Sequence, residues 1–312
     1  MTTVWLPYET REEAFRRIGV PPAGITVDIY NGDDTYPDSI REVEFYVVPY
    51  MAGPEVLGRR AEMSSLKVVQ TLTAGYEQFL PYLPEGVVLC NASGVHDEST
   101  AELALALILS SGRGLDLYAR QQSSQTWQPR FGTALVDKQV LIIGYGNVGK
   151  AIESRLKGFG PSRIVRVARS GRDGPPQVHG INELHELLPH ADVAILTAPH
   201  TRDTEGLISA AELALLPDGA LLVNVARGKL VDTMALLNEL STGRLRAALD
   251  VVDPEPLPRA HPLWSAPNTV ITPHVGGMST AFAPRADRMV TDQLRRFAHG
   301  KELLNVVRGA PK

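Results

Sequence analysis

Short apolar runs alternate with helical or polar segments along most of the chain. In the N-terminal part, these runs are rich in Val, Ile and Leu and are bounded by Gly, Pro or Asp, which is typical of strands. The expected strands cover residues 4–6, 26–30, 43–48, 67–72 and 87–90. Continuous apolar runs of this kind predict a parallel sheet that is covered on both faces. We therefore expect a small α/β unit in this part.

A long helix is expected next. Ser99 and Glu102 have the spacing of a capping box, in which the hydroxyl and the carboxylate each bind a free backbone amide. The apolar run after them reaches Gly112 and Gly114, where the helix should end. Capping explains Glu102 better than a role as catalytic acid does. The polar stretch 123–130 is expected to be a loop.

From Lys138 onward, strand-like and helix-like segments alternate regularly. Expected strands cover residues 139–143, 163–168, 192–197, 220–225, 246–251 and 269–272, and expected helices cover 147–157, 182–188, 209–216 and 232–240. Ser209 and Glu212 form another capping box. Strict alternation of strand and helix predicts a doubly wound parallel sheet. A last helix is expected over 283–299.

Composition narrows the class of protein. A chain of 312 residues suits two domains. A net charge of −4 argues against nucleic acid or an anionic membrane as partner. Cys90 is the single cysteine, which indicates a reducing compartment and excludes a cysteine-based zinc site. Since the N-terminus does not resemble a signal peptide and no apolar run approaches ~20 residues, we expect a soluble, cytoplasmic protein without a metal.

A glycine-rich segment opens the second series. Gly144-Tyr-Gly146-Asn-Val-Gly149 follows an expected strand and begins a helical pattern, which is the context in which G-x-G-x-x-G binds a dinucleotide. Gly144 permits a tight turn, Gly146 lets the backbone approach a pyrophosphate, and Gly149 lets the helix pack on the strand. Asn147 and Val148 start the helix whose N-terminus stabilises the phosphate charge. A sharp glycine turn without a ligand is the plainer alternative.

The end of the next expected strand bears on the choice of cofactor. Sites for NAD carry Asp or Glu there, which binds the 2′-hydroxyl of the adenosine ribose. This chain has Arg169 and Ser170 at that place, and Arg172 follows. Because these side chains suit a 2′-phosphate, we expect NADP as cofactor, with NAD as the second choice. A solvated basic loop is the plainer alternative.

Three later strands each lead into a side chain that can do chemistry. Arg227, Glu255 and His274 come a few residues after the ends of expected strands. Since parallel strands end at the same edge of a sheet, we expect these side chains to converge. A guanidinium can hold a carboxylate, a histidine can transfer a hydroxyl proton, and a neighbouring glutamate favours the imidazolium. With a nicotinamide as hydride carrier, the set suits a carbonyl/alcohol couple.

Four ordered segments, GYGNVG, NVARGKLVD, LDVVDPEPLP and TPHVGG, resemble the signatures of the D-isomer-specific 2-hydroxyacid dehydrogenases. The resemblance covers nearly the whole chain. It implies that Arg227 binds the substrate carboxylate and carbonyl, that His274 is the acid/base, and that Glu255 pairs with His274. It also implies an α/β protein of two doubly wound parallel-sheet domains, one a Rossmann-type cofactor domain and the other a smaller, flavodoxin-like substrate domain.

The same resemblance places further residues beside the ligands. Beside the cofactor it places Pro199, Thr204, Val225, Ala226, Asp250 and Gly276, in addition to Arg227 and His274. Beside the substrate it places Ala74 and Gly75, together with Arg227 and His274. Tyr50 and Met51 lie where the family shapes the pocket around the substrate's side chain, although core packing explains Met51 equally well.

The domain organisation implied by the resemblance is discontinuous. Residues 1–99 and 285–312 would form the substrate domain, and residues 100–284 the dinucleotide-binding domain. A homodimer is expected, formed through the helix region of residues 98–114.

Together these features predict a hydride transfer between NADP(H) and a small 2-oxo or D-2-hydroxy acid, with glyoxylate or hydroxypyruvate as the expected substrate. A D-3-phosphoglycerate dehydrogenase is the alternative within this class, although the first domain shows no obvious basic cluster for a phosphate. A cofactor-sensing binding protein with little turnover is the alternative outside it. Such a protein would bind the cofactor tightly and retain a partner protein.

Overall fold

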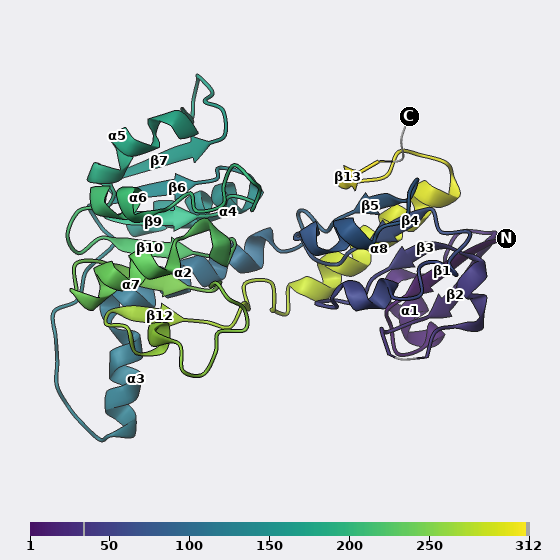
Figure 1. The fold of residues 1–312 in the computed structure, drawn as a ribbon, viewed down its shortest axis with the longest axis horizontal. Helices are drawn as coiled ribbons and strands as arrows, with labels where there is room; N and C mark the ends of the chain where they lie inside the picture. The colour runs from purple at the N-terminus through teal and green to yellow at the C-terminus, as the bar shows by residue number, and fades with distance from the viewer. Residues whose placement is uncertain (34, 310–312) are drawn as a thin grey trace. The chain divides into compact units, whose positions relative to one another are not determined.

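The computed structural model describes residues 1–33 and 35–309 and divides the chain into two compact units. Unit 1 combines Met1–His96 with Thr280–Lys312, and unit 2 is Asp97–Ser279. The second boundary, between Ser279 and Thr280, precedes the last helix, whereas residue 285, where the expected range 285–312 begins, lies inside that helix. Residues 310–312 of that range lie outside the described residues. Each unit has its own sheet, with helices on both faces (Figure 1).

Unit 1 contains a six-stranded sheet with the order β13-β5-β4-β3-β1-β2. Its strands are β1 (Thr2–Leu6), β2 (Ile25–Ile29), β3 (Val43–Val47), β4 (Val68–Gln70), β5 (Val88–Cys90) and β13 (Val306–Arg308). The strands expected in the N-terminal part are all present, and they pair in parallel. The sequence does not predict β13, which adds to β5 as an antiparallel edge strand.

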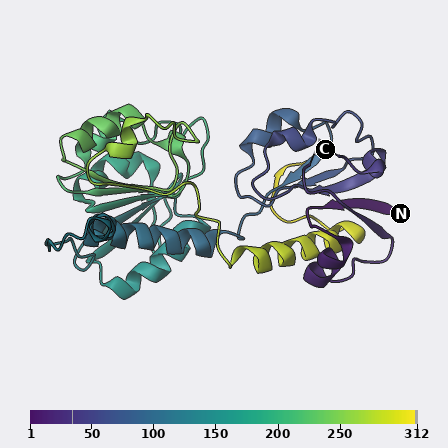
Figure 2. The same cartoon turned by 90° about the horizontal axis from the view of Figure 1, so that it is seen from below.

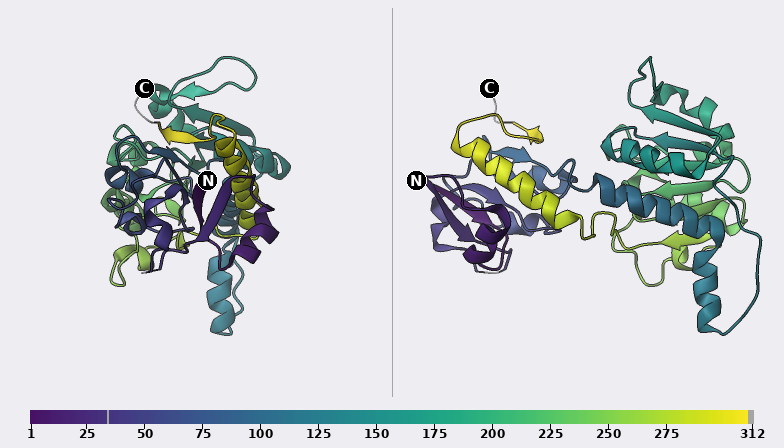
Figure 3. Two further views of the ribbon diagram at one scale, coloured as in Figure 1. Left: turned by 90° about the vertical axis from the view of Figure 1, so that its right-hand side faces the viewer. Right: turned by 180° about the vertical axis from the view of Figure 1, so that it is seen from behind.

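Two helices cover one face of this sheet: α1 (Arg11–Ile18) and α8 (Phe282–Ala298). Figure 3 shows α8 lying along the sheet although it comes from the other end of the chain. Its apolar side chains, including Met289 and Leu294, pack with Val4 and Phe45 of the sheet. The opposite face packs against short 3-10 helices, η1 (Asp38–Arg41), η2 (Pro54–Leu57) and η3 (Glu77–Tyr82).

Unit 2 contains a seven-stranded parallel sheet with the order β12-β11-β10-β9-β6-β7-β8. Its strands are β6 (Gln139–Ile143), β7 (Arg163–Ala168), β8 (His179–Gly180), β9 (Val193–Leu196), β10 (Leu221–Asn224), β11 (Arg246–Leu249) and β12 (Thr269–Ile271). The order reverses on either side of β6, so the doubly wound sheet predicted from the alternating pattern is confirmed. Only the short edge strand β8 is additional to the predicted set.

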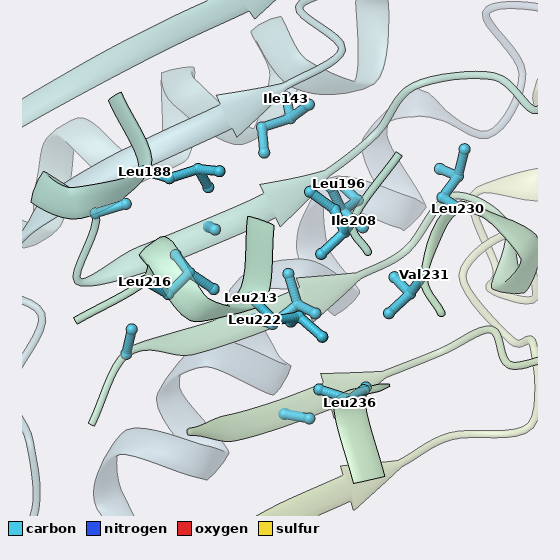
Figure 4. Close-up of a cluster of buried hydrophobic side chains, with 14 of the residues drawn as sticks. Ile143, Leu188, Leu196, Ile208, Leu213, Leu216, Leu222, Leu230, Val231 and Leu236 are labelled. Carbon is cyan, nitrogen blue, oxygen red and sulfur yellow. The ribbon is translucent and has the colours of Figure 1, made fainter. Parts of the chain in front are cut away.

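Helices cover both faces of this sheet (Figure 2). One face carries α2 (Asp97–Arg113) and α4 (Asn147–Leu156), and the other carries α5 (Leu184–Leu187), α6 (Ala210–Leu215) and α7 (Thr233–Ser241). Figure 4 shows the core on the face that carries α6 and α7, where Leu213 of α6 lies over Leu222 of β10. Leu236 of α7 belongs to the same cluster. The connections include η4 (Lys157–Phe159), η5 (Ile181–Glu183), η6 (Leu188–His190), η7 (Gly228–Leu230) and η8 (Pro262–Ser265).

The start of α2 differs from the prediction. The helix begins at Asp97, two residues before the predicted cap, so Ser99 lies inside it and the first capping box is wrong. The hydroxyl of Ser99 instead forms a hydrogen bond with that of Ser279, 2.7 Å away. Acidic residues at Asp97 and Glu98 suit the positive end of the helix dipole. The second box, at Ser209 and Glu212, is confirmed.

A further helix, α3 (Leu115–Ser123), was not predicted from the sequence. It starts after Gly114, which has a left-handed conformation (φ 65°), and it extends from the body of unit 2 with none of its residues buried (Figure 1). Among the described residues, no helix is long and apolar enough to cross a membrane.

Candidate active site

The glycine loop joins β6 to α4 at the carboxyl edge of the unit 2 sheet. Gly144 has φ +104°, and a Cβ at this position would lie 2.3 Å from the amide nitrogen of Ala198, so only glycine fits. At Gly149, a Cβ would lie 3.1 Å from Cγ2 of Ile142, so glycine lets α4 pack closely on β6. At Gly146, a Cβ would meet only the Gly144 carbonyl, 3.9 Å away, and the space above it is open. The predicted turn and packing are present, whereas phosphate binding stays a prediction.

The neighbouring strand β7 ends at the residues that are expected to bind the 2′-phosphate on the cofactor's adenosine ribose. Arg169 and Ser170 follow it directly, and both are exposed. Arg172 lies close to the glycine loop, since its Nη2 donates to the carbonyl of Tyr145 at 3.4 Å. Two guanidinium groups therefore follow the end of β7.

Arg227 follows β10, and Asn224 fixes the turn between them. Asn224 is 1% exposed; its Oδ1 accepts from the amide of Ala226 at 3.0 Å, and its Nδ2 donates to the carbonyl of Arg227 at 2.9 Å. Sequence reasoning missed Asn224, although a polar residue inside an apolar strand is a usable signal. Gly228 follows, and a Cβ there would lie 1.8 Å from the carbonyl oxygen of Val252. Close contact between these two loops therefore requires glycine.

Glu255 and His274 meet as predicted. Oε2 of Glu255 lies 2.8 Å from Nδ1 of His274, and its Oε1 accepts from the Val252 amide at 2.9 Å. The two side chains are 35% and 38% exposed, so solvent and small ligands can reach the pair. Burial alone raises the pKa of Glu255, but hydrogen bonds from His274 and Val252 and the charge of Arg227 together lower it below its usual value. Glu255 is therefore a carboxylate beside the imidazole.

Asp250 holds the loop that carries His274. Its carboxylate is 2% exposed and accepts hydrogen bonds from the Thr272 hydroxyl at 2.6 Å and from the amides of Val275 and Gly276, both at 2.9 Å. His274 itself has φ +54°, and its amide donates to the Asp250 carbonyl at 2.8 Å. Since the carboxylate has these internal partners, its contact with a nicotinamide stays a prediction.

The loop after β9 contains the other expected cofactor residues. The hydroxyl of Thr204 donates to the carbonyl of Pro199 at 2.7 Å, which closes the loop on itself. At the end of β9, the hydroxyl of Thr197 donates to the Gly144 carbonyl at 2.9 Å and so ties this strand to the glycine loop. Val225 and Ala226, after β10, are buried.

The expected substrate residues Ala74 and Gly75 belong to unit 1, just after the carboxyl end of β4. Asn91 donates its Nδ2 hydrogen to the Ala74 carbonyl at 2.7 Å, and the Thr73 hydroxyl donates to the Gly75 carbonyl at 2.7 Å. The loop is thus fixed by residues of its own unit, and its contact with a substrate stays a prediction.

The other expected pocket residues also belong to unit 1. The ring of Tyr50 lies in an aromatic cluster: its centroid is 4.1 Å from that of Phe282 and 5.6 Å from that of His96. Met51 is 46% exposed, so core packing does not explain it.

Known proteins are similar to this chain over most of its length. Residues 105–276 match the family model described as "D-isomer specific 2-hydroxyacid dehydrogenase, NAD binding domain". A glyoxylate reductase of Thermococcus kodakarensis is 31% identical over 250 residues, which cover 76% of this chain and 74% of that protein.

Solved structures from the same family resemble this chain over nearly its whole length. A D-isomer specific 2-hydroxyacid dehydrogenase family protein from Aeromonas salmonicida has a TM-score of 0.86 at 28% identity and covers 98% of this chain and 99% of its own. An NADPH-dependent glyoxylate/hydroxypyruvate reductase from Sinorhizobium meliloti has a TM-score of 0.82 at 25% identity and covers 100% of this chain and 99% of its own. The chain therefore belongs to the D-isomer-specific 2-hydroxyacid dehydrogenases, enzymes that act on CH–OH groups with NAD(P).

Proposed function

We propose that this protein is an NADPH-preferring reductase of small 2-oxo acids, with glyoxylate or hydroxypyruvate as substrate. The observation that carries the proposal is the pair of His274 and Glu255, 2.8 Å apart. Their loops follow β12 and β11, and β11 is the neighbour of β10, which leads to Arg227. Relatives named glyoxylate reductase and NADPH-dependent glyoxylate/hydroxypyruvate reductase support the substrate class.

In this proposal the three side chains have separate tasks. Arg227 binds the substrate carboxylate and polarises the neighbouring carbonyl oxygen. Protonated His274 donates a proton to that oxygen during reduction, and the neutral imidazole accepts it in the reverse direction. Glu255 holds Nδ1 of the ring, which leaves Nε2 for the substrate, and its charge stabilises the imidazolium. The nicotinamide cofactor, when bound, supplies or accepts the hydride.

The glycine loop fits a dinucleotide. The space above Gly146 is open, and Asn147 and Val148 begin α4, whose first amides have no partner within the helix. Arg169 and Ser170 would bind the 2′-phosphate of NADP, with the guanidinium of Arg172 nearby. The remaining cofactor contacts in this proposal are those of Gly144, Gly149, Pro199, Thr204, Val225, Ala226, Asp250 and Gly276.

Unit 2 is then the cofactor domain and unit 1 the substrate domain. The loop of Ala74 and Gly75 would offer backbone amides to the substrate carboxylate. Its rigid attachment to Asn91 and Thr73 supports this role, because a preset loop loses little entropy on binding.

A panel of 2-oxo acids, run with NADPH and NADH in parallel, tests the proposal. We expect loss of nicotinamide absorbance with glyoxylate or hydroxypyruvate, a higher kcat/KM with NADPH, and loss of turnover in His274→Ala. His185→Ala is the matched control, because His185 forms a similar pair with Glu212 at 2.6 Å elsewhere in unit 2. Equal or better efficiency with NADH overturns the cofactor preference, and no turnover with any acid overturns the activity.

Further measurements distinguish the alternatives: oxidation of 3-phosphoglycerate, cofactor affinity and a pull-down. Preferred oxidation of 3-phosphoglycerate identifies a D-3-phosphoglycerate dehydrogenase. Tight cofactor binding with negligible turnover, and a partner protein retained on the chain, identifies a cofactor-sensing binding protein.

We also propose that the chain forms a homodimer through the region of α2 and α3. The segment after α2 carries Leu115, Trp127 and Phe131 in exposed positions, the last two fully so. A cavity of about 780 Å³ lies at the amino ends of the unit 2 strands, lined in part by Leu115 and Tyr118. A second copy would cover this apolar surface. Light scattering that gives the mass of a monomer would overturn this proposal.

A further inference from the structure

A buried charged network lies beneath the glycine loop. Glu153 of α4 is 4% exposed, and both its oxygens accept hydrogen bonds from Arg166 of β7, at 2.5 and 2.6 Å. Oε2 also accepts from the hydroxyl of Tyr145 at 2.5 Å, and the Lys157 ammonium lies 3.3 Å from Oε1. The network therefore joins three elements: the glycine loop, α4 and β7.

Tyr145 is the member that belongs to the loop itself, between its first two glycines. Its backbone amide and that of Gly144 both donate to the carbonyl of Val167 on β7, at 2.8 and 2.9 Å. The Tyr145 carbonyl accepts from Arg172, and its hydroxyl reaches Glu153. Side chain and backbone thus attach this one residue to both neighbouring elements.

Stability alone does not explain a buried ion pair at this place. Removing a carboxylate and a guanidinium from water is costly, and well-packed apolar residues of similar volume often give an equal or higher stability. What such a pair adds is a fixed geometry, because a bidentate contact has one favourable orientation. Two nitrogens of the Arg166 guanidinium, Nε and Nη2, already donate to Glu153, so Arg166 does not serve as a ligand for a phosphate.

We propose that Tyr145, Glu153 and Arg166 are positioning residues that hold the glycine loop in its cofactor-binding conformation before the cofactor arrives. This inference rests on the proposed dinucleotide site. A preset loop needs no ordering when the ligand binds, so the network contributes to cofactor affinity without touching the cofactor. Since Arg227 and His274 follow other strands, β10 and β12, turnover at saturating cofactor should not depend on the network.

Tyr145→Phe tests the proposal with the smallest change, because it removes only the hydroxyl. We expect the Kd values of NADPH and NADH, measured by fluorescence titration, to rise by the same factor of about ten, in line with the loss of one hydrogen bond to a charged group. We expect kcat at saturating cofactor to stay unchanged. Glu239→Gln is the matched control, since Glu239 pairs with Arg244 at 2.5 Å away from the loop, and it should leave both Kd values unaltered.

A second variant distinguishes an effect on the position of the glycine loop from an effect on the stability of the fold. The double variant Glu153→Leu/Arg166→Met replaces the ion pair with apolar side chains, and we expect a Tm near that of the wild type together with weaker binding of both cofactors. If the double variant fails to fold, the Kd values of Tyr145→Phe test the proposal by themselves.

Three results would overturn the proposal: unchanged Kd values in Tyr145→Phe, weaker binding of NADPH alone, or a fall in kcat with unchanged binding. Wild-type protein that binds neither nucleotide refutes the proposed function as well. Wild-type binding together with an unaffected variant refutes only the role of the network.

Discussion

Nδ1 of His274 lies 2.8 Å from Oε2 of Glu255, and the two residues follow the neighbouring strands β12 and β11. Each is fixed independently of the other. The Asp250 carboxylate holds the amides on the C-terminal side of His274, and the Val252 amide holds the second oxygen of Glu255. The pair is thus set by the sheet before a substrate binds, which leaves Nε2 of the imidazole free for chemistry.

Glu255→Gln should lower kcat/KM, because the amide keeps the shape but not the charge that stabilises the imidazolium. The pKa of Glu255 is lowered, so the carboxylate is ionised above that pKa and is protonated as the pH falls through it. The difference in kcat/KM between wild type and Glu255→Gln should therefore be largest at neutral pH and should narrow in acid. A pH profile of both proteins measures it, and a difference that grows in acid would contradict this role.

Arg227→Lys should lower kcat/KM for 2-oxo acids by about 10- to 100-fold, because an ammonium keeps the charge but cannot form the paired hydrogen bonds of a guanidinium. Lys229→Met is the control, since Lys229 is an exposed cation two residues away. Steady-state kinetics at saturating cofactor give both values. An unaffected Arg227→Lys variant would show that charge alone suffices.

Gly228→Ala should destabilise unit 2, because the added Cβ would lie 1.8 Å from the carbonyl oxygen of Val252. A loss of about 1–3 kcal/mol in the free energy of unfolding is expected from such overpacking. Gly158→Ala is the matched control, since a Cβ there meets nothing within 4 Å. Thermal unfolding compares the two variants, and equal Tm values would show that the two loops can move apart at little cost.

Glu153 should make the stability of unit 2 depend on pH in acid. Hydrogen bonds from Arg166 lower the pKa of Glu153 from 4.5 to about 2, so its contribution is present above 4.5 and is lost as the pH falls towards 2. The shift corresponds to about 3 kcal/mol in the free energy of unfolding. Urea denaturation of wild type and Glu153→Gln should therefore differ at neutral pH and converge in acid. Glu186→Gln, at an exposed position, should show no such convergence.

Much of the fold follows from local sequence signals. The central strands of both sheets are buried apolar runs bounded by turn residues, and Ser209 with Glu212 marks a helix start that the structure confirms. Gly144 identifies the tight turn after β6, because its φ of +104° is a backbone conformation that favours glycine. Such features depend on neighbours in the chain, which the sequence displays directly.

Several features that sequence reasoning missed depend on partners far away in the chain. Ser99 has the spacing of a cap, but its partner is Ser279. β13 is a strand because it pairs with β5, and the sequence of residues 303–307 does not reveal that pairing. Asp250 was predicted to lie beside the cofactor, yet the hydrogen bonds that hold the His274 loop are visible only once that loop is built. The same holds for the ion pair of Glu153 and Arg166.

Unit 1 takes α8 and β13 from the end of the chain, after all of unit 2. A ribosome therefore completes the whole of unit 2 before it has made the helix that covers Val4 and Phe45. Until α8 emerges, only α1 covers that apolar face of the first sheet, and the part on which α8 packs stays exposed. The segment that is synthesised first is thus the last to reach its native packing.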